Sequence, residues 1–278
     1  MEDKSFEYLN GYRSCCKYYL NGNVNIILSA PHGGNLLPDD VPDRTEGICV
    51  DKSEIRRYKT SVLRDSRTDD FTENAANELM KRWNIKPFII IGKWHRIKVD
   101  FNREIQEGTL NQSEAISAYE NYHTHLNNAI DQVNQLFGKG LLIDIHGHSK
   151  GNYAMIGYML TSDQLNKNDL SDASFQTSIE SFCSSNRNEC IRGKTSFGTI
   201  FERNGLDIAY PSLQNPKPGS RTFFSGGHII RHYSPKINAI QTELPYHTRI
   251  GIEAFTNAQR FAQTIVEYMK IHNLFMFK

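Results

Sequence analysis

Apolar and polar residues follow two different periods along the chain, which predicts short strands that alternate with long helices. Apolar runs of strand length occupy 24–29, 87–92, 140–145, 153–160 and 238–245. Apolar residues spaced three and four apart predict helices over 68–83, 112–137, 171–183 and 251–272. Strands that are apolar on both faces and separated by helices are typical of α/β proteins. We therefore expect one α/β domain over 1–278.

The segment 140–150, GLLIDIHGHSK, changes abruptly from apolar to polar. Asp144, His146 and His148 stand at the end of the predicted strand, where open α/β sheets place their ligand sites. Histidine is the commonest metal ligand, and a neighbouring carboxylate often accepts its second ring proton. The pattern leaves two interpretations open, namely a transition-metal site and a strand-end histidine that is only hydrogen-bonded.

Two other strand ends carry chemistry of the same kind. The run 24–29 is followed by APHGG, so His32 leaves a second strand within a turn that glycines permit. Glu243 follows the apolar residues of 238–245, and Pro245 ends that strand. Glu243 suits either a catalytic carboxylate or one half of a buried ion pair.

The predicted helix 68–83 begins with two aspartates. Steps of three or four residues back from Trp83 reach Asp69, whereas Asp70 falls on the polar face. Helix phase therefore points Asp69 inward and Asp70 outward. Both acids also suit the positive end of the helix dipole, so a purely local role stays open.

Three further segments bear on a site. In 95–103, HRIKVDFNR, charged and apolar residues alternate, which predicts an extended segment with Arg96, Lys98, Asp100 and Asn102 on one side. The residues 35–59 are predicted to form a surface loop with little regular structure. The Pro- and Gly-rich residues 205–227 are predicted to form a long irregular loop of the kind that shapes substrate pockets.

Composition narrows the class of protein. The formal net charge of +1 gives no basis for a nucleic-acid partner. The N-terminal residues lack a signal-peptide pattern and no run is long enough to span a bilayer, so we expect a cytoplasmic protein without a membrane partner. The five cysteines lack CxxC spacing, which argues against a disulfide framework and a thiolate zinc site. Cys183 and Cys190 could pair in an oxidising compartment, and Cys15 and Cys16 have no assigned role.

Six short motifs occur in an order that resembles the N-formylglutamate amidohydrolase family. They are SAPHGG (29–34), the helix-opening Asp69, VDFNR (99–103), DIHGH (144–148), SGGHIIRHY (225–233) and QTELP (241–245). That family is similar in fold to zinc carboxypeptidases and acylamino-acid deacylases. The resemblance implies a three-layer α/β fold of the phosphorylase/hydrolase-like kind, with a mixed central sheet between helices.

The resemblance also implies a catalytic centre with one zinc ion. His32 and His146 match the metal-binding histidines of the family, and Asp69 matches its helix-opening acid. Two histidines and one carboxylate leave a position open for water, as catalytic zinc sites require. Glu243 matches the general base, and Arg96 is expected to stabilise the oxyanion.

The remaining matched residues are expected to bind substrate or to support the metal ligands. Asn102 and Arg103 match an Asn-Arg pair that resembles a clamp on a substrate carboxylate. Arg231 and Arg249 are candidates for a second carboxylate, and Asp144 and His148 for positions just outside the ligands. The predicted function is zinc-dependent cleavage of an N-acyl or peptide-like amide. The alternatives are a metallo-carboxypeptidase-like hydrolase of glutamyl peptides and an inactive ligand-binding homologue.

Overall fold

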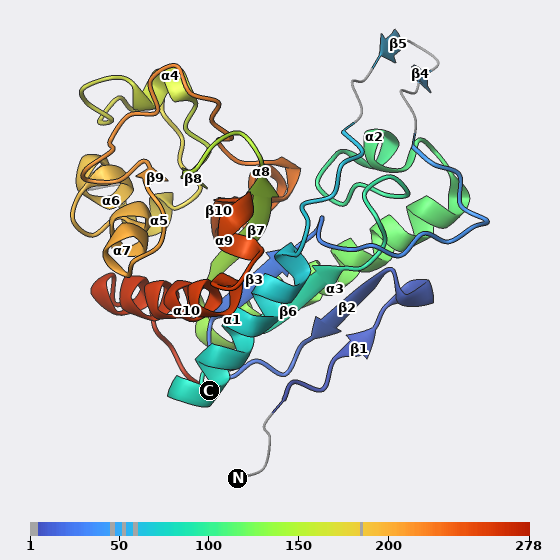
Figure 1. Ribbon diagram of the computed structural model, residues 1–278, viewed down its shortest axis with the longest axis horizontal. Helices are drawn as coiled ribbons and strands as arrows, with labels where there is room; N and C mark the ends of the chain where they lie inside the picture. The colour runs from blue at the N-terminus through green and yellow to red at the C-terminus, as the bar shows by residue number, and fades with distance from the viewer. Residues whose placement is uncertain (1–4, 45–47, 52–53, 58–60, 184–185) are drawn as a thin grey trace.

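A mixed eight-stranded sheet forms the centre of the computed structural model, which describes residues 5–44, 48–51, 54–57, 61–183 and 186–278 (Figure 1). The strand order is β1-β2-β6-β3-β7-β10-β8-β9. The bounds are β1 Leu9–Asn10, β2 Cys16–Tyr19, β3 Ile26–Ala30, β6 Phe88–Gly92, β7 Leu141–His148, β8 Ala154–Gly157, β9 Ala209–Tyr210 and β10 Asn238–Pro245. A separate antiparallel pair, β4 (Ile48–Asp51) and β5 (Glu54–Arg57), interrupts the loop predicted over 35–59.

The four central strands, β6, β3, β7 and β10, run parallel to one another. Their carboxyl ends therefore lie along one edge of the sheet, where ligand sites of such sheets form. The outer strands β2 and β8 pair antiparallel to β6 and β10 respectively. The sheet is thus mixed, as the sequence motifs implied.

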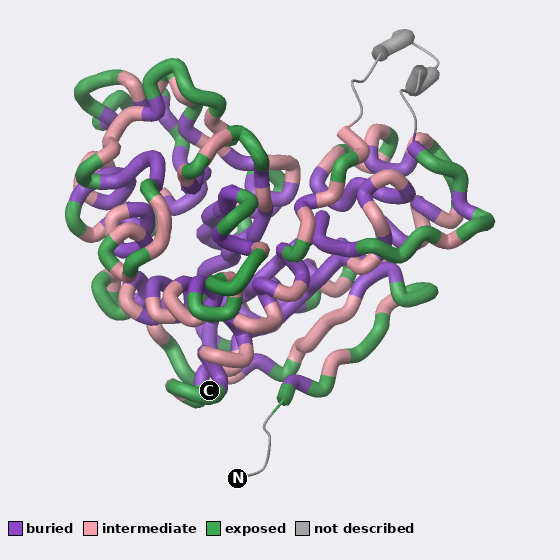
Figure 2. Tube along the Cα trace, in the orientation of Figure 1, coloured by how far each residue is buried: buried purple, intermediate pink, exposed green. Residues whose placement is uncertain are grey.

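Helices cover both faces of the sheet, which confirms the three-layer α/β class. On one face, α1 (Thr68–Trp83), α7 (Phe197–Arg203) and α10 (Ala254–Ile271) pack together (Figure 1). On the other face lie α3 (Ser113–Phe137) and α8 (His228–Tyr233). Side chains of a strand alternate between the two cores: Leu28 joins the first and Ile27 the second. The central strands are buried along their length (Figure 2).

The three long predicted helices form as α1, α3 and α10, but the predictions for two shorter segments were wrong. Of the predicted helix 171–183, only α5 (Glu180–Cys183) forms. Ser171 and Ser174 instead donate to the side chains of Asp169 and Asp172, and such local bonds compete with a helix. The segment 95–103 is a series of turns and is not extended.

Small helices fill the remaining connections of the described chain. They are η1 (Tyr12–Ser14), α2 (Ile105–Thr109), α4 (Ser162–Leu165), α6 (Arg187–Arg192) and α9 (Tyr246–Arg249). The predicted loop over 205–227 is irregular except for β9. No helix of the described residues is long and apolar enough to cross a membrane.

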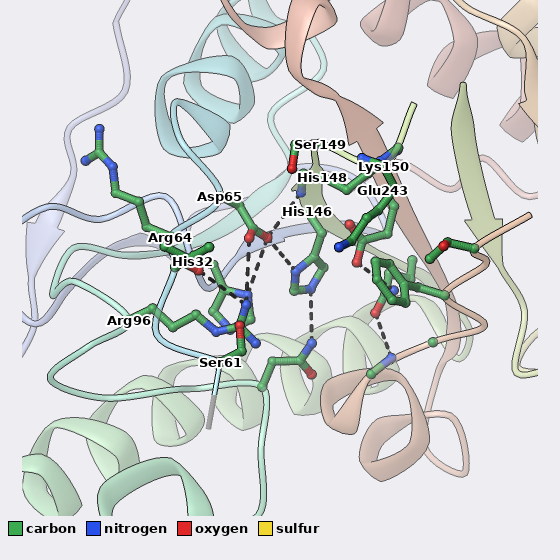
Figure 3. Close-up of a pocket in the computed structure, with 18 of the residues that line it drawn as sticks. His32, Ser61, Arg64, Asp65, Arg96, His146, His148, Ser149, Lys150 and Glu243 are labelled. Atoms are coloured by element: carbon green, nitrogen blue, oxygen red, sulfur yellow. Dashed lines mark hydrogen bonds and ion pairs between the residues drawn. The ribbon is translucent and has the colours of Figure 1, made fainter. Parts of the chain in front are cut away.

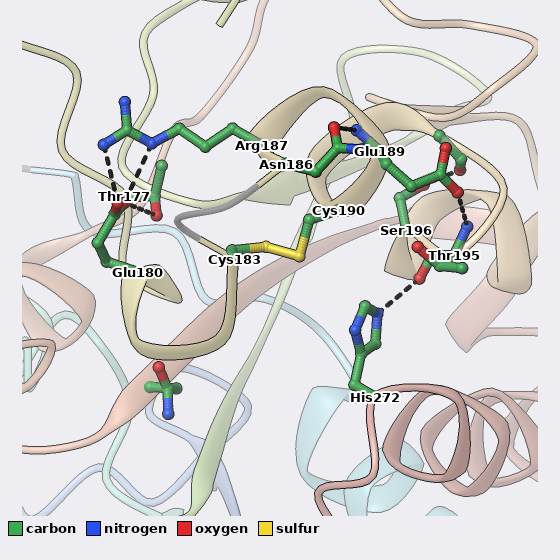
Figure 4. The surroundings of a disulfide bond; sticks show 12 residues. Thr177, Glu180, Cys183, Asn186, Arg187, Glu189, Cys190, Thr195, Ser196 and His272 are labelled. Atoms are coloured by element: carbon green, nitrogen blue, oxygen red, sulfur yellow. Dashed lines mark hydrogen bonds and ion pairs between the residues drawn. A yellow bond between two sulfur atoms is a disulfide. The ribbon is translucent and has the colours of Figure 1, made fainter. Parts of the chain in front are cut away.

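The cysteines divide into one bonded pair and one free pair among the described residues. Cys183 at the end of α5 and Cys190 in α6 form a disulfide, with Cα atoms 5.8 Å apart (Figure 4). Cys15 and Cys16 are free and buried, with Sγ atoms 3.8 Å apart. The disulfide therefore joins Cys183 and Cys190, the two cysteines whose pairing in an oxidising compartment the sequence left open.

Candidate metal centre

His32, Asp65 and His146 form a buried cluster at the carboxyl ends of the parallel strands (Figure 3). His32 follows β3, His146 lies in β7, and Asp65 lies in the turn before α1. Asp65 Oδ2 is 3.4 Å from Nδ1 of His32 and 3.0 Å from Nδ1 of His146. One ligand atom from each residue lies within 4.8 Å of the other two. The three side chains thus converge as metal ligands do.

The carboxylate of this cluster corrects the sequence prediction, which selected Asp69. Asp69 lies four residues after Asp65, within α1, and its Oδ2 accepts a hydrogen bond from Lys93 Nζ at 2.6 Å. Asp70, the other candidate, pairs with Arg67 at the surface. The periodicity of the helix can distinguish only Asp69 from Asp70, because both lie inside α1. Asp65, which reaches the histidines, lies before α1 in a turn that has no periodic pattern.

The turn that carries His32 depends on a glycine. A Cβ atom added to Gly33 would lie 2.3 Å from the backbone nitrogen of Asp69, a distance that real Cβ contacts do not show. Glycine therefore lets the PHGG turn pack directly against the start of α1. This close packing brings His32 next to the turn that contains Asp65, whose N–H donates to the His32 carbonyl at 3.0 Å.

Each histidine is oriented by a second carboxylate on its far nitrogen. His32 Nε2 is 2.7 Å from Asp100 Oδ1, and His146 Nε2 is 2.8 Å from Asp144 Oδ2. Both aspartates are fully buried. A carboxylate that accepts Nε2–H leaves the Nδ1 lone pair for a metal. Asp144 was predicted for this role, and Asp100 was not.

The donor set fits a divalent metal ion. Nδ1 of His32 is buried and lacks a hydrogen-bond partner among the described residues. An unpaired buried nitrogen is costly unless something outside the chain uses it. Two imidazole nitrogens and one carboxylate form the protein part of many catalytic zinc sites. His32, Asp65 and His146 would hold such an ion.

The electrostatics of the cluster favour charge on both kinds of ligand. Burial opposes ionisation of Asp65, but a hydrogen bond from His146 and the charges of His146 and His32 hold the pKa of Asp65 below its usual range. Burial likewise opposes the charged form of His146, yet Asp144 and Asp65 raise the pKa of His146 well above its usual value. A site that attracts a proton so strongly also attracts a cation that can replace it.

Glu243 stands beside the cluster on the neighbouring strand β10. It is paired in register with His146 of β7, and Figure 3 shows it on the opposite side of His146 from His32. Burial raises the pKa of Glu243 to about 7, against the charges of His146 and others. Gln241 donates to its Oε1 at 3.2 Å. The predicted general base therefore lies on the strand that adjoins His146, next to the cluster.

Arg96, Asn102 and Arg103 also reach this site, although they lie in turns. Arg96 Nε donates to Asp100 Oδ2 at 2.7 Å, and its Nη1 is 3.8 Å from Asp65. Asn102 Oδ1 accepts from the Ile229 N–H, and its Nδ2 lies 3.2 Å from His146 Nε2. The Asn102 amide is thus held between the Ile229 backbone and the His146 ring, and Arg103 is the member of this pair more exposed to a ligand. Lys98 turns away and pairs with Asp43.

Three other predicted residues line the same cavity with different roles. Arg231 on α8 lines the cavity and is exposed. Arg249 is buried and donates to the backbone carbonyls of Ser66, Leu244 and His148, so it holds the chain around the site. His148 donates from Nε2 to the Tyr153 carbonyl and accepts the Lys150 N–H at Nδ1. His148 therefore fixes a loop and touches no metal ligand through these bonds.

The cavity at this site has a volume of about 1010 Å³. Its lining includes the cations Arg64, Arg96, Arg103, Lys150, Arg231 and Arg249, whereas its described acids are Asp65 and Glu243. The whole chain carries only +1, so positive charge is concentrated here. Such a cavity favours an anionic ligand.

Asp65 and Asp100 are the functional candidates that the sequence reasoning missed. For Asp100 a signal existed, because the alternation of 95–103 placed it beside Arg96 and Asn102. No such signal marked Asp65, because it lies in a polar turn where apolar and polar residues follow neither the helical nor the strand period.

Comparisons with known proteins concern the fold. Protein-family models and curated proteins gave no match. The structure is similar to that of N-formylglutamate amidohydrolase from Ralstonia eutropha JMP134, with 14% identity, 90% of this chain and 93% of that chain covered, and a TM-score of 0.50. A metallo-carboxypeptidase from Burkholderia cenocepacia gives 11% identity, 89% and 56% coverage, and a TM-score of 0.42. The chain therefore has the fold of an N-formylglutamate amidohydrolase, as its six motifs indicated.

Proposed function

We propose that this protein is a metal-dependent hydrolase that cleaves an amide bond in a substrate with a free carboxylate. The observation that carries the proposal is the buried His32, Asp65 and His146 cluster with Glu243 on the adjoining strand. Metal ligands and a nearby buried acid form the arrangement that activates water for attack on a carbonyl. The likeness in fold to an amidohydrolase agrees with this function.

Zinc is the ion that we propose for the site. Two imidazoles and one carboxylate suit zinc and leave a coordination position free. When bound, zinc would polarise the amide carbonyl and lower the pKa of a water molecule.

The side chains around the cluster then have separate tasks. Glu243 takes a proton from the attacking water and delivers it to the leaving amine. Arg96, held by Asp100, places positive charge near the carbonyl oxygen as negative charge develops there. Asp100 and Asp144 keep both histidine rings in the orientation that directs Nδ1 inward.

The substrate that we propose is an N-acyl amino acid of the N-formylglutamate type. Arg103 and Arg231 line the cavity and can bind carboxylates through paired N–H groups. A glutamate-like substrate supplies one carboxylate beside the amide and a second on its side chain. The neighbouring protein of similar fold is named for such a substrate.

A glutamyl peptide is the second candidate, and the volume of the cavity favours it. Cavities for ligands of drug size measure about 300 to 1,000 Å³. The cavity here measures about 1010 Å³, so an acyl group as small as formyl would leave much of it empty. A peptide of several residues would fill more of the volume and meet more of its cations.

Metal content and a substrate panel test the proposal together. We expect stoichiometric zinc in the purified protein, and hydrolysis that chelation abolishes and added zinc restores. N-formylglutamate, N-acetylglutamate, and α- and γ-linked glutamyl peptides would be compared, and the order of kcat/KM decides between the two candidates. A protein that binds zinc and these compounds but hydrolyses none of them would be the inactive ligand-binding homologue, and would contradict the proposal.

A further inference from the structure

A line of buried hydrogen bonds leads from His146 away from the cavity and into the core. His146 Nε2 is 2.8 Å from Asp144 Oδ2, and Asp144 Oδ1 accepts from Ser29 Oγ at 2.8 Å. Ser29 Oγ is in turn 2.7 Å from the Tyr122 hydroxyl. Ser29, Tyr122 and Asp144 are fully buried, and His146 is 2% exposed. These four side chains form what we call the His146 relay.

The fold places these residues together through strand register. Ser29 of β3 and Asp144 of β7 are paired directly across neighbouring parallel strands. Ile27 and Leu142 lie two positions earlier in the same strands, and both belong to the hydrophobic core beneath α3. Ser29 and Asp144 therefore point to the same face, where Tyr122 of α3 meets them. The relay joins two strands and a helix that are far apart in sequence.

The direction of each hydrogen bond follows from the donors present. Asp144 accepts from both Ser29 and His146, as an ionised carboxylate does. The single hydroxyl proton of Ser29 is used on Asp144, so the Tyr122 hydroxyl must donate to Ser29 Oγ. His146 then carries a proton on Nε2, so a metal ion that replaced the Nδ1 proton shared with Asp65 would meet the Nδ1 lone pair. The order of donors fixes the tautomer that a metal ligand needs.

The two histidines are supported by chemically different groups. Asp100, behind His32, is held by the charged guanidinium of Arg96 at 2.7 Å. Asp144, behind His146, is held by the neutral hydroxyl of Ser29. Ser29 therefore orients the Asp144 carboxyl group without placing a positive charge against it.

We infer that Ser29 and Tyr122 are positioning residues of the metal site, acting on His146 through Asp144. The inference rests on the proposed metal site and assigns a role to two residues that contact neither metal nor substrate. Packing alone does not account for the Tyr122 hydroxyl, because the ring already stacks on Phe101 at 4.4 Å and phenylalanine would keep that contact. The hydroxyl in this position has Ser29 as its partner.

Metal affinity of conservative variants tests the inference. Ser29→Ala and Tyr122→Phe remove one hydroxyl each, and Tyr268→Phe is the matched control, because the Tyr268 hydroxyl is also buried but has no hydrogen-bond partner among the described residues. Zinc affinity would be measured by chelator competition, the ligand field by the visible spectrum of the Co²⁺-loaded protein, and the fold by thermal unfolding of the metal-free protein.

We expect Ser29→Ala and Tyr122→Phe to weaken zinc binding by about tenfold, and to shift the Co²⁺ spectrum, since partners outside the ligands are worth about 10- to 100-fold in affinity. Tyr268→Phe should change neither. The double variant should lose little more than Ser29→Ala alone, because the hydrogen bonds of the described residues connect Tyr122 to Asp144 through Ser29.

Unchanged zinc affinity and an unchanged Co²⁺ spectrum in both variants would overturn the inference, even if their metal-free forms unfold at lower temperature. A loss in Ser29→Ala without one in Tyr122→Phe would remove Tyr122 from the relay. These results are independent of hydrolysis: a wild type that binds zinc and shows the relay effects but cleaves no amide would contradict the proposed function alone.

Discussion

Asp65 Oδ2 lies 3.0 Å from Nδ1 of His146, although 81 residues separate the two in sequence. The turn before α1 and the end of β7 meet at this contact, and the Arg249 side chain donates to the Ser66 and His148 carbonyls on its two sides. Asp65 therefore reaches the histidines because the surrounding backbone is tied in place. This relationship makes Asp65 the carboxylate of the proposed metal site.

Replacement of Asp65 should weaken metal binding strongly, whereas replacement of Asp69 should not. Asp65→Asn keeps the shape of the side chain but removes the charge that His32 and His146 share, so we expect zinc affinity to fall by more than about a hundredfold. Asp69→Asn is the matched control, because it breaks only the contact with Lys93. Zinc affinity by chelator competition measures both. The reverse pattern would instead identify Asp69 as the carboxylate ligand.

The sequence predicted the parts of the site that follow regular strands. His32, His146 and Glu243 each come after an apolar run, and parallel strands bring their carboxyl ends together. Asp65 and Asp100 lie in turns, where neither period applies, and only tertiary packing decides which polar side chain faces the site. The segment 95–103 was predicted to be extended because its polar and apolar residues alternate. It forms turns instead, since side-chain contacts within the fold hold its polar residues.

Glu243→Gln should separate catalysis from metal binding. The amide keeps the size of the side chain and its place beside Gln241, but it cannot accept the proton of an attacking water. We expect kcat to fall by about 10² to 10⁴ with zinc content unchanged. Steady-state rates and metal analysis on the same preparation would show this. Retained turnover would mean that another group acts as the base.

His123 should make the protein less stable in acid. Its Nε2 lies 2.9 Å from the Phe101 carbonyl and its Nδ1 2.9 Å from the Tyr233 hydroxyl, so the buried ring is neutral. Burial lowers the pKa of His123 to about 3, from about 6.5 in the unfolded chain. Between these values the unfolded state binds more protons, so the free energy of unfolding falls as the pH falls.

The expected loss for His123 between pH 7 and pH 5 is about 2 kcal/mol. Urea unfolding at the two pH values measures it. His123→Gln removes the titrating group and should reduce this pH dependence by the same amount, even though the variant is less stable at pH 7. An equal pH dependence in wild type and variant would show that other groups cause it.

The Cys183–Cys190 disulfide should stabilise the protein in the absence of reductant. The bond closes a loop with a sequence separation of 7, and restriction of so short a loop in the unfolded chain is worth about 2 kcal/mol. The double variant Cys183→Ala/Cys190→Ala should lose about this much free energy of unfolding. Reductant should destabilise wild type and leave the double variant unchanged.

Arg231 offers a test of the second carboxylate that a glutamate-like substrate carries. The side chain is exposed on α8, lines the cavity of about 1010 Å³, and also lines a neighbouring cavity of about 340 Å³ together with Arg103. Because Arg231 is exposed and is not one of the proposed metal ligands, it can contact a distal part of the substrate without altering those ligands. We therefore expect Arg231→Ala to raise KM for N-formylglutamate by about tenfold, with kcat little changed.

A substrate without the side-chain carboxylate makes this prediction specific to Arg231. N-formylmethionine keeps the amide and the neighbouring carboxylate, so its KM should be the same in wild type and Arg231→Ala. Arg203→Ala, which removes a surface ion pair with Glu267 away from the cavity lining, is the control for a general loss of positive charge. An equal rise in KM for both substrates would mean that Arg231 binds no second carboxylate. A rise for N-formylglutamate alone would place that carboxylate beside α8, because only a direct contact distinguishes two substrates that differ in that one group.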